Sequence, residues 1–283
     1  MDKVRLIEKS THGTPAFPVA VYDMHFDNNT TLLAPLHYHS EFELLVATKG
    51  SISVQIEENT YILLEGEGIF INSGLLHVIK AYTDDEHEFI AVVFDYSIIC
   101  NKQDNIYAKY IKPLIDGEMQ LRFNLNNYEC DMVHHICNSY KNTQYGYELY
   151  IKELLINTIY NLIKDSTITS TNNQNNKSIL IKTVLDYIEE NYAQQISLTD
   201  MAQHAHISKE YLCRLFSSMY DTTPIEYLNR YRIRQSTSEI LNTNRTISDI
   251  ALSYGFNNSS YYNKLFLRYI GCTPSEYKKT KDV

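Results

Sequence analysis

The sequence lacks the marks of secreted, disulfide-stabilised and membrane-spanning proteins. Its five cysteines are odd in number, scattered along the chain, and form no CxxC pair. This usage disfavours a disulfide framework or a zinc ribbon and predicts a protein of the reducing cytoplasm. No apolar run in it approaches the ~18–20 residues that cross a bilayer. The first ten residues also lack the apolar core of a signal peptide, so we expect no membrane partner.

The composition is that of a globular protein with an uneven distribution of charge. The 283 residues are 44% hydrophobic and 21% charged. This length is about twice that of a typical domain, which predicts two domains. Residues 1–165 carry 12 Lys and Arg against 23 Asp and Glu, whereas residues 166–283 carry 13 against 11 and six of the eight arginines. A polyanionic partner would therefore meet the C-terminal part of the chain.

A polar segment divides the chain. Residues 165–178 (DSTITSTNNQNNKS) lack a core-forming pattern and lie where the balance of charge changes, which predicts a flexible linker. Before it, residues 15–95 contain short β-type runs separated by glycine, and residues 125–164 turn helical. The predicted fold class is α+β with two domains. The first covers residues 1–164, and the second, over residues 179–283, has helical periodicity throughout.

The second domain contains an internal repeat of about 50 residues. SLTDMA at 197–202 matches TISDIA at 246–251, YLCRLF at 211–216 matches YYNKLF at 261–266, and TPIEY at 223–227 matches TPSEY at 273–277. Nine positions are identical in the two copies. Each copy begins with a capping-box pattern, continues through a turn, and opens a second helix at a good N-cap residue. The repeat therefore predicts two helix-turn-helix units.

The second helix of each unit is amphipathic. The inner-face residues are Leu212, Leu215, Phe216 and Met219 in the first copy and Tyr262, Leu265, Phe266 and Tyr269 in the second. Arg214 and Lys264 occupy equivalent positions on the outer faces. In a helix-turn-helix, this outer face enters the major groove of double-stranded DNA. A helical bundle with solvated outer faces is the alternative for a single unit, but two matched copies favour DNA binding.

The stretch between the two units predicts a rigid spacer. Residues from Pro224 to about Leu241 form one expected helix that begins with proline at its first position. Its ~18 residues would span ~27 Å. This length suits two helices that address successive major grooves on one face of DNA, which lie ~34 Å apart.

Residues 179–279 resemble the DNA-binding domain of the AraC/XylS family of bacterial transcription regulators. The resemblance rests on IALSYGFNNSSYYNKLFLRYIGCTPSEY (250–277) and DTTPIEYLNRYRI (221–233). Asp221 replaces the usual glycine of the family pattern, and Ser236 replaces a common alanine. The resemblance implies DNA contacts from Lys209, Glu210, Cys213 and Arg214 in the first copy and from Ser259, Ser260, Asn263 and Lys264 in the second. Ser217 lies on the same outer face and joins this set.

A histidine-rich motif lies in the first domain. HYHSEFELLVATKG contains His37-x-His39-x3-Glu43, and His77 follows after a stretch with several glycines. On a strand, His37, His39 and Glu43 would share one face. Three imidazoles and one carboxylate that converge from two strands could hold Fe, Mn, Ni, Cu or Zn.

This pair of motifs resembles the cupin superfamily, a small β-barrel, with Asn72 in place of the usual proline. The residues that we expect to contact a small organic ligand in the barrel are His37, His39, Glu43, His77, Tyr22 and Tyr38. Apolar walls with hydroxyl groups suit a small polar effector such as a sugar. A metal ion held by the three histidines and Glu43 is an alternative, and a solvated outer face is another. We predict the organic ligand, with no metal and no cofactor.

A helical hairpin is expected to end the first domain. Residues 147–164 (YELYIKELLINTIYNLIK) have an apolar stripe too wide for a helix that lies on one core. Together with residues 127–140 they resemble the hairpin through which sensor domains of this family dimerise. Burial within the same domain is the alternative. We expect a homodimer.

The sequence as a whole predicts a cytoplasmic, effector-responsive transcription regulator without catalytic residues. The resemblance implies an activator, whose further partner would be RNA polymerase. An effector in the barrel would shift the population of DNA-binding arrangements. A metal-dependent cupin enzyme fused to a DNA-binding domain is the alternative from another class. A regulator whose barrel binds no ligand and serves only assembly is a third.

Overall fold

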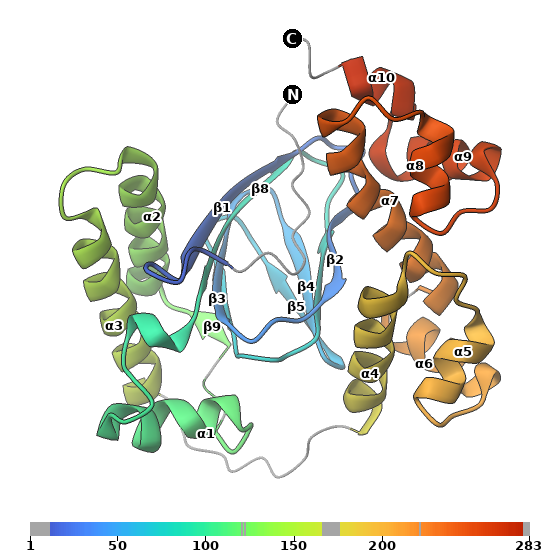
Figure 1. The fold of residues 1–283 in the computed structure, drawn as a ribbon. Helices are drawn as coiled ribbons and strands as arrows, with labels where there is room; N and C mark the ends of the chain where they lie inside the picture. Colours follow the sequence, from blue (N-terminus) through green and yellow to red (C-terminus); the bar gives the residue numbers. More distant parts are fainter. Residues whose placement is uncertain (1–11, 120, 122, 166–175, 221, 280–283) are drawn as a thin grey trace. The chain divides into compact units, whose positions relative to one another are not determined.

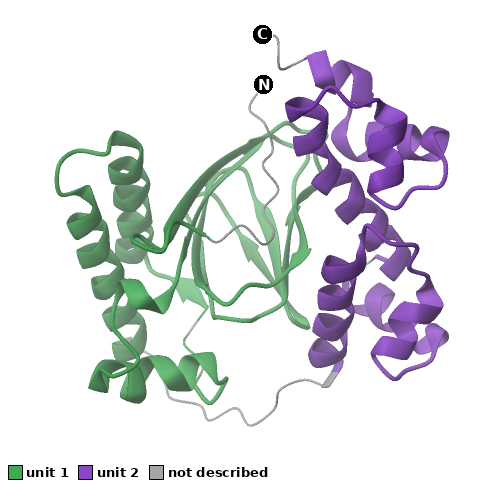
Figure 2. Cartoon of the chain, in the orientation of Figure 1, with its two compact units in different colours: residues 1–174 green, residues 175–283 purple. Residues whose placement is uncertain are grey.

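The chain forms two compact units, Met1–Gln174 and Asn175–Val283 (Figure 2). The computed structural model describes residues 12–279 apart from 120, 122, 166–175 and 221. Most of the expected linker, and Asp221, therefore lie outside the described residues. The polar end of that linker, from Asn176 to Ser178, already belongs to a helix.

The first unit is built on two antiparallel sheets that face each other (Figure 1). The five-stranded sheet has the order β1 (Val19–Phe26), β8 (His87–Phe94), β3 (Phe42–Lys49), β6 (Gly68–Ile71) and β9 (Asn124–Leu125). The four-stranded sheet has the order β2 (Leu32–His37), β7 (His77–Ala81), β4 (Ile52–Ile56) and β5 (Asn59–Leu63). The chain passes from the second sheet to the first between β2 and β3.

The two faces of the five-stranded sheet carry two different cores. Because side chains alternate along a strand, β3 sends Leu45 and Ala47 into the space between the sheets and Leu44 and Val46 to the opposite side. The inner core joins both sheets, since Leu45 packs in one cluster with residues of β4 such as Val54. The outer core is completed by helices.

Two helices cover that outer side, α2 (Asn127–Asn142) and α3 (Tyr147–Asp165) (Figure 1). Asn126 caps α2 in a reciprocal box with Glu129. Short helical segments join β8 to β9, and they lie at Tyr96–Ile98, Tyr107–Ile111 and α1 (Lys112–Ile115). The described part of this unit is therefore the expected mixture of sheet and helix, and the α+β prediction is confirmed.

The second unit is helical. Its helices are α4 (Asn176–Asn191), α5 (Leu198–His204), α6 (Lys209–Tyr220), α7 (Pro224–Asn242), α8 (Ile247–Ser253), α9 (Ser259–Ile270) and α10 (Pro274–Lys279). The pairs α5–α6 and α8–α9 are the two predicted helix-turn-helix units, and α7 is the predicted connecting helix. No helix among the described residues is long and apolar enough to cross a membrane.

The two helix-turn-helix units form for the local reasons that the repeat indicated. Ser197 caps α5 in a complete box with Asp200, whose shorter side chain still reaches back to the Ser197 N–H. The turns that follow need a left-handed residue, which is His206 at φ 56° in the first unit and Gly255 at φ 76° in the second. Asn258 then caps α9 through the N–H groups of the first turn.

The inner faces of α6 and α9 are buried as predicted, except that Tyr269 at the end of α9 is only half-buried. Phe216 and Phe266 are among the largest fully buried side chains. Ser236, the replacement for a family alanine, is also fully buried. Its hydroxyl donates to the Ile233 carbonyl at 2.6 Å and lies 2.8 Å from the Tyr262 hydroxyl, so this polar group is satisfied.

Candidate functional site

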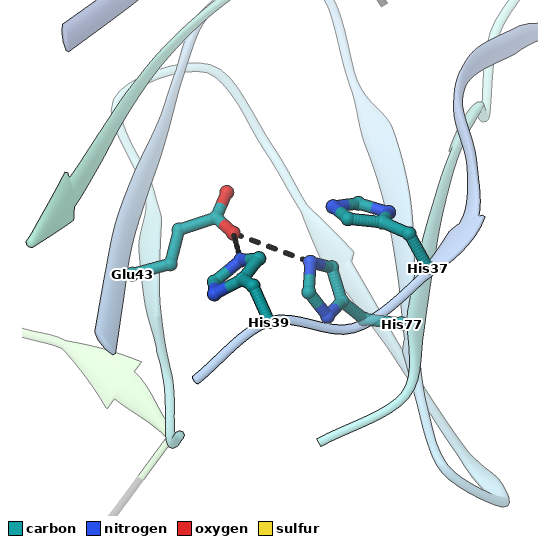
Figure 3. A group of neighbouring side chains, drawn as sticks. All are labelled: His37, His39, Glu43 and His77. Atoms are coloured by element: carbon teal, nitrogen blue, oxygen red, sulfur yellow. Dashed lines mark hydrogen bonds and ion pairs between the residues drawn. The ribbon is translucent and has the colours of Figure 1, made fainter. Parts of the chain in front are cut away.

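Four side chains converge inside the first unit (Figure 3). His37 ends β2, Glu43 lies on β3, and His77 begins β7. His39 lies in the turn between β2 and β3, so the interpretation that placed His37, His39 and Glu43 on one strand is wrong. The chain crosses between the sheets at this turn, which directs the three side chains toward one point. One ligand atom from each of the four residues lies within 4.8 Å of the others.

The cluster belongs to the interior and not to a solvated face. Glu43 has the same parity on β3 as Leu45, which lies in the core between the sheets. Glu43 is 4% exposed and His77 is fully buried, while His37 and His39 are half-buried. Buried polar atoms need partners, so this cluster must be satisfied from within.

The backbone fixes which nitrogen of each imidazole carries a proton. Nδ1 of His37 lies 2.8 Å from the Pro35 carbonyl, and Nδ1 of His77 lies 2.8 Å from the Leu75 carbonyl. Nδ1 of His39 lies 3.1 Å from the carbonyl of Glu41. Because a carbonyl oxygen can only accept a hydrogen bond, each Nδ1 carries a proton. All three Nε2 atoms are therefore the groups left for other partners.

Glu43 is the electrostatic centre of the cluster. Its Oε2 lies 3.1 Å from Nε2 of His39 and 3.2 Å from Nε2 of His77. Burial opposes a charge on Glu43, but the hydrogen bond from His39 and the close approach of His77 hold the pKa of its carboxyl well below the ordinary range. Burial also opposes a charge on His39, yet the hydrogen bond and charge of Glu43 raise the pKa of that imidazole. Burial and the neighbouring His77 lower the pKa of His37, which is therefore neutral.

The donor set fits a divalent transition metal. Three imidazole nitrogens and one carboxylate oxygen suit Zn, Fe, Mn, Ni or Cu. Rings oriented through Nδ1 by backbone carbonyls are the usual support of metal-binding histidines. The fully buried Nε2 of His77 also lacks a hydrogen bond of good geometry, although it lies close to Glu43. A cation between these atoms would satisfy it.

A cavity of about 50 Å³ adjoins the cluster. One wall is polar and consists of His12, Tyr22, His37, His39 and Glu43. The remaining walls are apolar and consist of Met24, Leu33, Ala34, Pro35, Ile79, Phe89, Ala91 and Val93. A water molecule needs ~10–15 Å³ on this measure, so the cavity has room for a few water molecules.

The structure changes the expected set of cavity residues in three ways, the first of which is that His77 belongs to the cluster but not to the cavity lining. Tyr22 lines the cavity as expected, but Tyr38 is not among its lining residues. His12 was not expected there: it is 8% exposed, its ring centre lies 5.1 Å from that of His39, and its Nδ1 lies 3.0 Å from the Tyr22 hydroxyl. A lone histidine 25 residues before the motif gives no sequence signal.

The outer faces of α6 and α9 present most of the expected DNA-contacting residues to solvent. The exposed residues of this set are Lys209, Glu210, Arg214, Ser217, Ser260, Asn263 and Lys264. Cys213 and Ser259 are half-buried. The Arg214 guanidinium lies 5.3 Å from the centre of the Tyr211 ring, a cation–π contact. Hydrogen bonds from the backbone N–H and from Ser208 lower the pKa of Glu210, so this carboxylate also caps the start of α6.

Two family models match the chain. An AraC-like ligand-binding domain matches residues 20–158, and a helix-turn-helix domain matches residues 201–280. The first therefore spans both sheets and α2 and ends within α3, and the second begins within α5 and extends through the second helix-turn-helix unit.

Known proteins resemble the chain over most of its length or over about a third of it. The HTH-type transcriptional regulator YdeC of Bacillus subtilis is 27% identical over 281 residues, which are 97% of this chain and 96% of YdeC. The HTH-type transcriptional activator AarP of Providencia stuartii is 36% identical over 102 residues, which are 36% of this chain and 76% of AarP. The solved structure of ToxT from Vibrio cholerae with a bound unsaturated fatty acid is 17% identical and covers 92% of this chain and 94% of its own, with a TM-score of 0.48.

The fold and these matches define a helix-turn-helix transcription regulator with a DNA-binding domain and a separate ligand-binding domain. The chain belongs to the AraC family.

Proposed function

We propose that the chain is a homodimeric transcription activator of the cytoplasm that responds to a small effector bound beside His37, His39, Glu43 and His77. It binds promoter or operator DNA through the outer faces of α6 and α9. At the promoter it contacts RNA polymerase. Effector binding shifts the population of DNA-binding arrangements, because the effector favours one of them.

The buried cluster is the observation that carries the proposal. A sheet core gains nothing from three imidazoles and a carboxylate, because buried polar groups cost free energy unless they are fully paired. His77 Nε2 has no well-formed hydrogen bond. A ligand with its own donor and acceptor groups would supply the missing partners. The adjoining apolar walls would then select its shape.

The cavity volume limits the size of the effector. A sugar is larger than the few water molecules that about 50 Å³ can hold. A more compact polar effector fits the cavity with His12 in place.

A transition metal is the second candidate occupant of this site. His37, His39, Glu43 and His77 would be its ligands, and the metal would supply Lewis-acid character to the cavity when bound. A metal-dependent enzyme fused to a DNA-binding domain would need that metal. Elemental analysis of protein purified without chelator separates the two functions. Near-stoichiometric transition metal supports the metal-dependent form, whereas a metal-free chain that still regulates excludes it.

Ligand binding is expected to raise the thermal stability of the full chain. A ligand at 100 times its dissociation constant stabilises the bound state by ~2.7 kcal/mol. A thermal-shift screen of sugars, other small polar metabolites and divalent metals measures this effect. The cavity is the binding site if Glu43→Gln removes the shift. A shift that survives in Glu43→Gln places the ligand elsewhere.

Dimerisation is proposed through α3. Its outer side exposes Leu149 at 75% and Tyr160 at 61%, with Ile156 between them. Apolar side chains of this size are more often covered in the assembled protein. Sedimentation of the full chain measures its oligomeric state. A monomer at all concentrations contradicts this part of the proposal.

Alanine at Arg214 or Lys264 is expected to weaken DNA binding without unfolding the domain. Both side chains are exposed on the outer faces of their helices, so little burial is lost. A base contact would cost ~1–3 kcal/mol, concentrated at one position of the DNA site. Equal loss on all sequences, with a shallower salt dependence, assigns the residue to phosphate. Unchanged affinity for both variants contradicts the proposed interface.

A further inference from the structure

The loop between α4 and α5, which precedes the first helix-turn-helix unit, contacts the second helix-turn-helix unit directly. The segment 192–195, which follows α4, meets the turn between α8 and α9. The Tyr192 ring stacks on Tyr254 with centroids 6.0 Å apart. Gln195 Nε2 donates to the Gly255 carbonyl at 3.2 Å, and Asn257 Nδ2 donates to Gln195 Oε1 at 2.9 Å. This junction joins the α4–α5 loop to the turn of the second helix-turn-helix unit.

Arg232 lies at the centre of this junction. It is on α7 and only 6% exposed. Its Nε donates to the Tyr192 carbonyl at 2.7 Å, and its Nη2 donates to the Gln194 carbonyl at 2.7 Å. Its guanidinium lies 5.6 Å from the centre of the Phe256 ring, in the turn of the second helix-turn-helix unit. One side chain on the connecting helix therefore contacts both the α4–α5 loop and the second helix-turn-helix unit.

Gly255 packs against the same guanidinium. A Cβ at this position would lie 2.7 Å from Arg232 Nη2 and 2.8 Å from the Tyr192 carbonyl. Its positive φ of 76° also favours glycine. The turn of the second helix-turn-helix unit thus packs on Arg232 so closely that position 255 has no room for a side chain.

The chemistry of Arg232 suits a positioning role better than a purely stabilising one. Burial lowers the pKa of this arginine, because removal from water disfavours its charged form. Its two hydrogen-bond acceptors are carbonyls just beyond the C-terminal end of α4, where the helix dipole favours positive charge. An apolar side chain in this place would leave the Tyr192 and Gln194 carbonyls without these two donors. What a guanidinium adds is directed contacts in fixed geometry.

Apart from the junction, α7 connects the two helix-turn-helix units. The connecting helix α7 packs extensively on α8, α9 and α10 but meets α6 over a shorter stretch. Without the junction, the first helix-turn-helix unit could rotate about the start of α7. The separation and angle of α6 and α9 would then vary.

We propose that Arg232 is a positioning residue that locks the two helix-turn-helix units together and so sets the spacing of the two DNA half-sites that the domain accepts. This inference rests on the proposed contact of both α6 and α9 with DNA. One inserted base pair moves a half-site by ~3.4 Å and rotates it by ~35°. A locked pair of helices cannot follow this change, whereas a loosened pair can.

The test compares half-site spacing in the full-length chain and in Arg232→Gln. The probe is a DNA site selected from a random-sequence library by the wild-type chain, with one or two base pairs then inserted or deleted between its half-sites. Wild type is expected to lose about tenfold or more for one base pair, the size of a lost base contact. Arg232→Gln is expected to bind the best spacing more weakly and to vary by less than about threefold across the series, because a flexible connection tolerates more spans. A folded Arg232→Gln that keeps the wild-type spacing profile overturns the proposal.

Two controls keep the outcome decisive. Thermal unfolding shows whether Arg232→Gln is folded. If it is not, the double variant Gln195→Ala with Asn257→Ala decides, because it removes only exposed or half-exposed contacts of the junction. An unchanged spacing profile in that double variant overturns the proposal. If the wild-type chain selects sites with a single contacted segment, the proposed use of both helices fails and the locking role fails with it. If the wild-type chain selects two half-sites but tolerates changes in their spacing, the locking role of Arg232 is contradicted, while the contact of both helices with DNA stands.

Discussion

Phe216→Ala is expected to destabilise the first helix-turn-helix unit by ~3–5 kcal/mol. Phe216 is fully buried on the inner face of α6, beside Leu212 and Leu215. Removing its ring leaves a cavity that these neighbours cannot fill. A loss of this size is a large part of the stability of a small domain, so DNA binding is expected to fail as well.

Hydrogen exchange in the intact chain measures this loss, because peptides from α5 to α7 can be followed separately from the first unit. Their exchange is expected to accelerate by about two to four orders of magnitude. Ser217→Ala is the matched control: it alters the next residue on the exposed face and should change stability by less than ~0.5 kcal/mol. Protection that persists in Phe216→Ala contradicts the placement of this ring in the core.

Glu43→Ala is expected to destabilise the first unit by ~3–5 kcal/mol, because it leaves the buried imidazole of His39 without its charged partner. Glu43→Gln keeps the size of the side chain and an acceptor oxygen, so its loss of stability should be smaller. It removes the negative charge from the cluster, however, and should shift the effector response by ~5–150-fold. Binding of DNA without effector is expected to stay nearly unchanged, because α6 and α9 belong to the other unit.

The measurements are thermal unfolding of the full chain and DNA-binding titrations with and without the ligand found by the screen. Glu86→Gln is the matched control, since Glu86 is an exposed carboxylate paired with Lys49 and should leave stability and response unchanged. His39→Gln provides a second variant of the cluster. If Glu43→Gln and His39→Gln both keep the wild-type effector curve, the cluster is not the effector site.

The sequence predicted the second unit well because its information is local. Caps, turn residues and the spacing of apolar residues lie within one unit, and the repeat shows each of them twice. The sequence does not reveal the role of one arginine of this unit, Arg232. Arg232 was counted among the cations available to a polyanion, but it is buried and contacts carbonyls that lie 38 and 40 residues away. No local pattern marks such a partner.

The cluster in the first unit was predicted by residue but not by geometry. The turn between β2 and β3 contains neither glycine nor proline, so the sequence reads as one strand. Its hydrogen bonds come from a distant loop: Gly74 N–H donates to the His39 carbonyl at 2.8 Å, and the Ser73 hydroxyl donates to the Ser40 carbonyl at 2.6 Å. Tertiary contacts of this kind decide the path of the chain after the local signals are exhausted.

The hydrogen bonds from the imidazole Nδ1 atoms to backbone carbonyls have a consequence for how the sensor can diversify. The acceptors of His37 and His77 are main-chain groups two residues earlier in the chain, so they do not depend on any neighbouring side chain. The cavity therefore has one fixed polar end and an apolar wall that is free to vary. Substitutions at Met24, Leu33 or Phe89 would reshape the space available to a ligand while the three imidazoles keep their orientation. A library confined to that wall is a direct route to biosensors that report new molecules through the same DNA-binding output.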